Sequence, residues 1–169
     1  MSQDEILEAH KARVQTLLYG EPSLTLPKAE WMAQIVDATS QVIVVMKARG
    51  LDPREYYDHR ASFLGNLGRH AESIADLIAM HDPTCHNRIL LRRIAVACEN
   101  AGQDENALEA IDASIATKEA GAYEQEIRGR ILRRLGRDSE AAKDEAAVKK
   151  YHETEAKKWS DPNHYYSHK

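Results

Sequence analysis

NLGR at 66–69, NAGQ at 100–103 and RLGR at 134–137 are short stretches whose glycines fall at equal intervals along the 169-residue chain. Gly68, Gly102 and Gly136 define this interval, because 102 − 68 and 136 − 102 both give 34. Each stretch lies between two segments in which apolar residues recur at helical spacing. A glycine at such a place ends one helix, since it adopts a left-handed backbone conformation without steric cost. The chain is therefore expected to repeat a unit of two helices.

Other positions follow the same interval. A small residue stands seven before each glycine, an apolar residue four before it, and another small residue five after it. These are Ala61, Ala95 and Gly129; Leu64, Cys98 and Leu132; and Ser73, Ala107 and Ala141. Small side chains let two helices approach closely, and the apolar ones fill the space between them. The spacing predicts close-packed pairs of antiparallel helices.

This pattern resembles the tetratricopeptide repeat family over residues 55–151. The resemblance implies an all-α fold, a right-handed superhelical stack of antiparallel helix pairs with about eight helices. It places three repeats at about 55–85, 86–119 and 120–153. The chain departs from the family at the apolar position just before the first small residue, where Ile94 is accompanied by Arg60 and Arg128. We expect looser or more solvent-exposed packing at the helices that carry these two arginines.

Helical patterns also flank the repeats. Residues 4–19 and about 27–50 predict an atypical helical hairpin, domain 1–52, packed on the repeat domain 53–159. The last repeat ends in a long capping helix, 139–159, and 160–169 is expected to be a flexible tail. The inner face of that helix is expected to carry Ala141, Ala142, Glu145, Val148, Tyr151 and His152. In the hairpin, Trp31, Met32 and Ile43 fall on more than one side of a helix, which makes a homodimer through this hairpin a hypothesis.

Composition and motifs exclude several classes of protein. The chain has a formal net charge of −4 at pH 7 and a mean hydropathy of −0.59, and its aliphatic run at 42–46 is too short to span a membrane. The first residues lack the basic and apolar regions of a secretory signal, so a cytoplasmic protein without membrane contact is expected. No nucleophile with a placed base, paired acid motif or phosphate loop is present. We expect no enzymatic activity, no cofactor and no metal site.

The family resemblance implies that the first helix of each repeat lines a concave groove that binds a peptide of a partner protein. The candidate ligand-binding residues are His59, Ser62, Asn66, Arg92, Arg93, Val96, Asn100, Tyr123, Ile127, Arg130, Arg133 and Arg134. The five arginines form a basic stripe on a mildly acidic chain, and the guanidinium fork suits carboxylate or phosphate. An alternative stays open, in which the stripe is a solvated face whose charges pair locally, Arg92 with Glu99 or Arg130 with Glu126.

The sequence thus predicts a non-enzymatic protein- or peptide-binding module, a scaffold or adaptor, with an acidic ligand as one candidate. A small secretion-type chaperone holding a client protein is the alternative, based on a similar layout of a helical pair and three repeats. A second alternative is a nucleic-acid binder acting through the arginine stripe. The acidic net charge and the scarcity of aromatic residues beside the arginines, with Tyr123 as the exception, argue against it.

Overall fold

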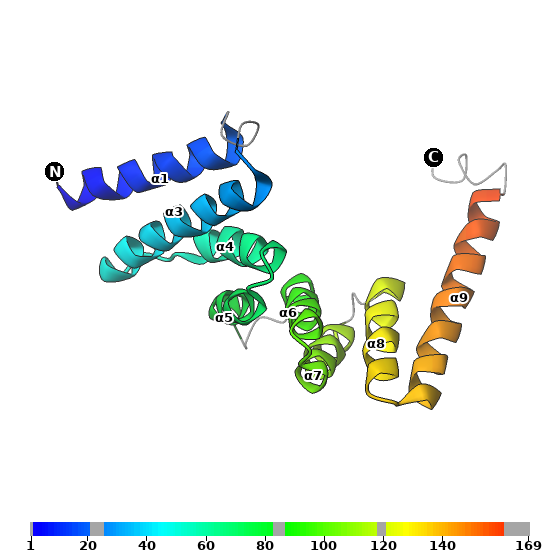
Figure 1. The fold of residues 1–169 in the computed structure, drawn as a ribbon. Helices are drawn as coiled ribbons and strands as arrows, with labels where there is room; N and C mark the ends of the chain where they lie inside the picture. Colours follow the sequence, from blue (N-terminus) through cyan, green and yellow to red (C-terminus); the bar gives the residue numbers. More distant parts are fainter. Residues whose placement is uncertain (1, 21–25, 83–86, 118–120, 161–169) are drawn as a thin grey trace. The chain divides into compact units, whose positions relative to one another are not determined.

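The computed structural model describes residues 2–20, 26–82, 87–117 and 121–160, which form α-helices and no strand (Figure 1). The helices are α1 (Gln3–Tyr19), α3 (Lys28–Ala48), α4 (Arg54–Asn66), α5 (His70–Met80), α6 (Arg88–Asn100), α7 (Asp104–Ile115), α8 (Ala122–Arg134) and α9 (Asp138–Ser160). The predicted all-α fold is confirmed. None of these helices is both long and apolar enough to cross a bilayer.

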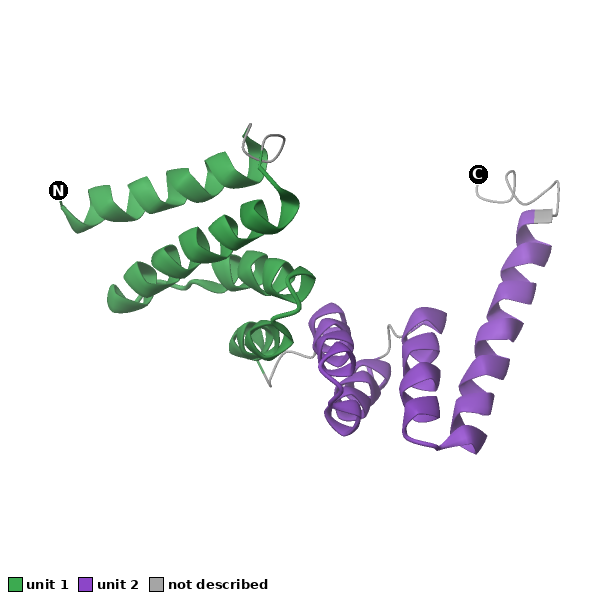
Figure 2. Ribbon diagram, viewed as in Figure 1, with its two compact units in different colours: residues 1–85 green, residues 86–169 purple. Residues whose placement is uncertain are grey.

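The chain divides into two compact units, residues 1–85 and 86–169 (Figure 2). The sequence predicts an N-terminal hairpin, 1–52, packed on a repeat domain, 53–159. In the structure the hairpin of α1 and α3 and the first predicted repeat, α4 and α5, belong to the same unit. The second and third predicted repeats, α6 with α7 and α8 with α9, form the other. The predicted tail lies outside the described residues, apart from Ser160.

Glycine turns end the first helix of each predicted repeat. Gly68, Gly102 and Gly136 have φ angles of 74°, 73° and 70°, so all three adopt the left-handed conformation that the sequence predicts. After each of them, the next residue's N–H donates to a carbonyl five residues earlier, at 2.9 Å in all three cases. This is the 6→1 hydrogen bond of a Schellman motif, which satisfies a helix-end carbonyl. Gly50 ends α3 in the same way, with φ 66° and the same 2.9 Å bond.

The small residues allow close approach within each helix pair. In the first pair the Ser73 hydroxyl of α5 donates to the Ala61 carbonyl of α4 at 2.8 Å. In the third pair a Cβ added to Gly129 of α8 would lie 3.5 Å from the Cβ of Asp144 on α9. These separations bring backbone and Cβ atoms of two helices into contact, as the spacing of small residues predicts.

The core of the first unit joins α1, α3 and α4. Leu7 and Val14 of α1 pack with Ile35 and Val42 of α3 in one buried cluster, and Tyr56 of α4 belongs to it. The same residues explain the helical pattern seen in the sequence, because each helix turns its apolar side to this cluster.

Trp31 ties the three helices together, because its Nε1 donates to the Leu17 carbonyl at 2.6 Å and its ring meets Phe63 edge to face at 5.4 Å. Met32 and Ile43 are buried as well, so these two side chains cannot mediate the homodimer suggested from the sequence.

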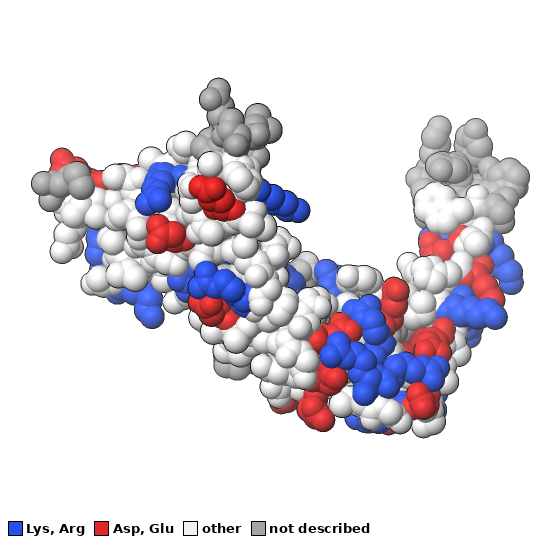
Figure 3. Space-filling model, viewed as in Figure 1, with Lys and Arg blue, Asp and Glu red and all other residues white. Residues whose placement is uncertain are grey.

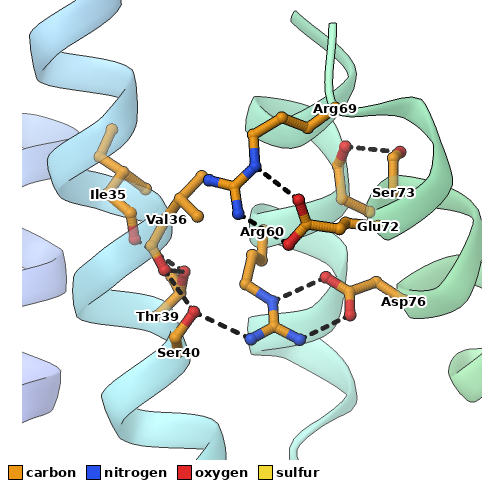
Figure 4. A network of polar contacts seen from close by, with 10 residues as sticks. Ile35, Val36, Thr39, Ser40, Arg60, Arg69, Glu72, Ser73 and Asp76 are labelled. Atoms are coloured by element: carbon orange, nitrogen blue, oxygen red, sulfur yellow. Dashed lines mark hydrogen bonds and ion pairs between the residues drawn. The ribbon is translucent and has the colours of Figure 1, made fainter. Parts of the chain in front are cut away.

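Arg60 and Arg128 do not loosen the helix pairs, contrary to the sequence-based expectation. Arg60 of α4 forms two 2.7 Å hydrogen bonds with the buried carboxylate of Asp76 on α5, and a third of 2.9 Å with Ser40 of α3 (Figure 4). Arg128 of α8 binds Asp144 of α9 through bonds of 2.8 and 2.6 Å. Each arginine therefore fills its apolar position as half of a bidentate ion pair.

The two ion pairs occupy equivalent places two repeats apart in the sequence. The arginine positions and the aspartate positions differ by the same amount, because 128 − 60 and 144 − 76 both give 68, which is twice the glycine interval. The second repeat has Ile94 and Ala110 at these two positions. The middle repeat thus has two apolar residues where the other two repeats carry the ion pair.

The capping helix α9 exposes much of the face that was predicted to be its inner one. Ala141 is buried, but Ala142, Glu145, Tyr151 and His152 are exposed. Asp144 is buried in their place because Arg128 binds it. The prediction of the inner face was wrong at these positions, because it did not include the ion pair with Arg128 that allows Asp144 to be buried.

Candidate functional site

The predicted ligand-binding residues fall into two sets, one in each unit. His59, Ser62 and Asn66 lie on α4 in the first unit. The other nine lie on α6 and α8 of the second unit, whose helices contact each other directly. The geometry of a site can therefore be built on α6 and α8.

Arg92 of α6 is held by Glu124 of α8. Its Nη1 lies 3.1 Å from Glu124 Oε1, and Arg88 Nη1 lies 2.6 Å from the same oxygen. The other oxygen of Glu124 accepts the Gly121 N–H at 2.9 Å, which caps the start of α8. The side chain of Glu124 is only 1% exposed. Burial opposes its ionisation, but the bonds from Gly121 and Arg92 outweigh burial and hold the pKa of Glu124 below its ordinary value.

Arg130 of α8 is held by Glu99 of α6 in the reverse sense. The guanidinium binds both carboxylate oxygens of Glu99, at 2.6 and 2.7 Å. Arg134 donates to the Glu99 backbone carbonyl at 3.0 Å and forms a 3.0 Å ion pair with Asp104. Two ion-pair clusters therefore join α6 to α8, one with its arginines on α6 and its acid on α8, the other with its acid on α6 and its arginines on α8.

Arg133 is paired within the last helix pair. It binds Glu145 of α9 through bonds of 2.9 and 2.8 Å and Asp138 at 3.0 Å. In Figure 3 the basic side chains of this unit lie among acidic ones. These arginines pair with carboxylates of the protein itself, as the alternative interpretation anticipated, but the pairs of Arg92 and Arg130 join different helices and their partners differ from the suggested Glu99 for Arg92 and Glu126 for Arg130. An incoming acidic ligand would therefore meet guanidinium groups that already hold a carboxylate of the protein.

Not every predicted residue reaches the surface. Ile127 is 1% exposed and belongs to the core between helices, and Val96 is half-buried. Tyr123 is 56% exposed, and the guanidinium of Arg92 lies over its ring at 4.9 Å from the centroid.

Sequence reasoning missed Ile89 of α6, which is 53% exposed. Its position could have been found, because 123 − 89 again gives 34 and Ile89 therefore holds the place of Tyr123 in the preceding repeat.

The surface of α6 and α8 thus combines two exposed apolar side chains with fixed polar ones. Ile89 and Tyr123 stand at equivalent positions near the starts of the two helices. Arg93, Val96 and Asn100 continue along α6 at intervals of four, three and four residues from Ile89, and therefore share one face of the helix. Such a surface can bind a polypeptide by burying the apolar side chains and by hydrogen bonds from the polar ones.

Three solved structures of MamA proteins resemble this chain. The structure described as "Crystal structure of MamA" has a TM-score of 0.65 and 19% sequence identity, covering 92% of this chain and 87% of MamA. A second, "Crystal structure of MamA protein", has a TM-score of 0.64 at 19% identity, with coverage of 92% and 81%. "MamA 41-end from Desulfovibrio magneticus RS-1" has a TM-score of 0.61 at 13% identity, with coverage of 90% and 92%.

These similarities extend over nearly the whole chain and concern its fold. No protein-family model and no curated protein matches the sequence. The likeness to MamA supports a helical-repeat architecture, in agreement with the glycine interval.

Proposed function

We propose that this chain is a non-enzymatic protein-interaction module of the tetratricopeptide type, a scaffold or adaptor that binds a partner polypeptide on the surface of α6 and α8. The observation that carries the proposal is the pair Ile89 and Tyr123, both more than half exposed at equivalent positions of consecutive repeats. Large apolar side chains at the surface are where binding energy is usually concentrated, since their burial removes apolar area from water.

The ion pairs around this surface support the proposal by limiting its motion. Glu124 fixes Arg92, and Arg92 in turn lies against the Tyr123 ring. Glu99 fixes Arg130 on the neighbouring helix. A surface whose side chains are already held loses less conformational entropy on binding.

The acidic ligand remains a prediction with a specific obstacle. The stripe arginines Arg92, Arg130, Arg133 and Arg134 have carboxylate partners on the protein itself. The same pairing weakens the case for nucleic acid, whose phosphates would need these arginines. We therefore favour a ligand that is recognised mainly through apolar contact.

Affinity capture with surface variants tests the proposal. The variant Ile89→Ser with Tyr123→Ser should lose most of any specific partner captured from native lysate, while the helical circular dichroism signal stays unchanged. Ile78→Ser is a matched control, because Ile78 is comparably exposed but lies on α5 in the other unit. Equal capture by the wild type and the double variant would refute a binding site at Ile89 and Tyr123.

A further inference from the structure

The end of the second unit carries an open groove between its last two helices, α8 and α9, which we call the end groove. Glu126, Arg130 and Arg133 of α8 form one wall, and Glu145, Val148 and Lys149 of α9 form the other. Its volume is about 490 Å³. Val148 and the aliphatic stems of the longer side chains make much of its surface apolar.

The preceding repeat indicates what kind of structure fits such a groove. Subtracting 34 from the six positions gives Arg92, Val96 and Glu99 on α6 and Ile111, Ser114 and Ile115 on α7. Helix α8 contacts both of these helices. It binds Arg92 through Glu124 and Glu99 through Arg130, and Ile111 and Ser114 are fully buried. The equivalent surface one repeat earlier, on α6 and α7, is therefore occupied by an α-helix, α8, and we call this surface the filled seat.

The charges of the end groove are the reverse of those in the filled seat. Arg92 corresponds to Glu126, and Glu99 corresponds to Arg133, since both pairs are separated by one repeat interval. In the filled seat, α8 supplies an acid at 124 and a base six residues later at 130. A helix seated in the same way on the end groove would need a base facing Glu126 and an acid six residues later facing Arg133 and the neighbouring Arg130.

Glu126 is available for such a contact. It is exposed and forms no ion pair or hydrogen bond with any residue that the structure describes. Arg133 already holds Glu145 and Asp138, and Arg130 holds Glu99, yet Arg130 and Arg133 remain 52% and 47% exposed. A partner carboxylate would add to these clusters without displacing a member.

The complementary helix is not one of the described helices of this chain. The required pattern is a base at position n, an apolar residue at n + 3, as Ile127 is to Glu124, and an acid at n + 6. Only Arg93, Val96 and Glu99 of α6 satisfy it among the described helices, and Glu99 is buried and bound to Arg130. A helix of another protein is therefore the occupant that the charges of the groove favour.

Helix α9 extends the surface beyond the groove. It has 23 residues against 13 in α8. Tyr151 is half exposed and follows Val148 by three residues, so both lie on one face of α9. An amphipathic helix seated beside α8 and parallel to it could contact Val148 and Tyr151 along one line.

We propose that the groove of α8 and α9 binds an amphipathic α-helix of a partner protein, parallel to α8, with a base against Glu126 and an acid against Arg130 and Arg133. This rests on the proposed function, because it identifies the partner segment as a helix and gives it a second place to bind.

A peptide built from α8 itself provides the probe. Residues 122–134 with Glu124→Lys and Arg130→Glu carry the predicted charges, and the unaltered sequence is the control. A side-chain lactam keeps both peptides helical, because isolated helices of this length are marginal in water. Fluorescence anisotropy with the full chain should give an affinity for the charge-swapped peptide about fivefold or more above that for the control.

Protein variants decide between a specific seat and nonspecific association. Glu126→Lys should weaken binding of the charge-swapped peptide and restore binding of a peptide that keeps Glu124. Val148→Asp should abolish binding, whereas Lys150→Glu, on the same helix outside the groove, should leave it within about twofold of wild type.

Equal affinity for both peptides, no binding of either, or no reversal with Glu126→Lys would overturn the proposal. A concentration-dependent dimer mass in light scattering that Val148→Asp abolishes would also overturn it, because a second copy would then fill the groove.

The two proposals can fail separately. If a partner captured through Ile89 and Tyr123 binds Val148→Asp as well as wild type, and the peptides do not bind, the module stands without this groove. If the peptides bind as predicted while the Ile89 and Tyr123 variant loses no partner, the groove stands and the site on α6 and α8 fails.

Discussion

Removal of one member of the Arg60–Asp76 pair should destabilise the first unit far more than removal of both. Asp76→Ala deletes a carboxylate with a 5% exposed side chain that accepts two 2.7 Å hydrogen bonds from Arg60. Arg60 would keep its hydrogen bond to Ser40, and its side chain is already 21% exposed to solvent. We therefore expect a loss of about 2–4 kcal/mol, somewhat below the cost of breaking a fully buried pair.

The reverse single change should cost more. Arg60→Ile leaves the Asp76 carboxylate buried without its guanidinium, and the expected loss is about 3–5 kcal/mol. The double variant Arg60→Ile with Asp76→Ala copies Ile94 and Ala110 of the second repeat, where the isoleucine is buried. Its stability should lie within about 1 kcal/mol of wild type, because apolar replacements of buried ion pairs are often neutral.

Urea unfolding followed by tryptophan fluorescence measures these differences. The chain has two tryptophans, and Trp159→Phe leaves Trp31, which packs on Phe63, as a reporter of the first unit. Glu72→Ala in the exposed Arg69–Glu72 pair is the control and should cost less than about 0.5 kcal/mol. A double variant as unstable as either single variant would refute the argument. So would a cost for Asp76→Ala as small as that of the exposed control.

Three further predictions concern turns, acid stability and the buried Cys98 thiol. Gly102→Ala should cost about 1 kcal/mol because Gly102 has φ 73°, whereas Gly65→Ala inside α4 should stabilise by up to about 1 kcal/mol, as measured by thermal unfolding. The pKa of Glu124 is lowered in the folded protein. Ionised Glu124 therefore adds to the free energy of unfolding above its unfolded pKa of about 4.3, and this stabilisation is lost as the pH falls through the folded pKa. Glu124→Gln should flatten the pH dependence of the free energy of unfolding in urea over that range. Burial raises the pKa of the Cys98 thiol, so iodoacetamide should label it in urea and leave it unmodified in the folded protein, as read by mass spectrometry.

The sequence predicts the helix pairs well because their signals are local. A glycine with a positive φ ends its own helix, as Gly68 does. A small residue at a fixed offset from that glycine lets the paired helix approach, as Ser73 does. The constant interval between the glycines then supplied the register for every repeat. The helix bounds follow closely from these signals.

The candidate site was harder to predict because its contacts join different helix pairs. Nothing in the spacing of Arg130 indicates that Glu99, 31 residues earlier, binds it across two helices. The packing of Arg60 was misjudged because an arginine at an apolar position was considered without its partner. The signal was nevertheless present, since Asp76 and Asp144 follow Arg60 and Arg128 at one and the same offset. At that offset from Ile94, where the arginine is missing, the aspartate is replaced by alanine.

The alternation of ion pairs and apolar residues at these positions also restricts which helices can pair during folding. If α4 paired with α7 in place of α5, Arg60 would face Ala110 and lose its carboxylate. If α6 paired with α5, Ile94 would cover Asp76 and leave that acid without a base. Either exchange would bury an uncompensated charge at a cost of several kcal/mol. The middle helix pair is thereby kept from exchanging helices with either of the other two, whereas the first and third pairs carry the same arginine and aspartate and are not distinguished at these positions.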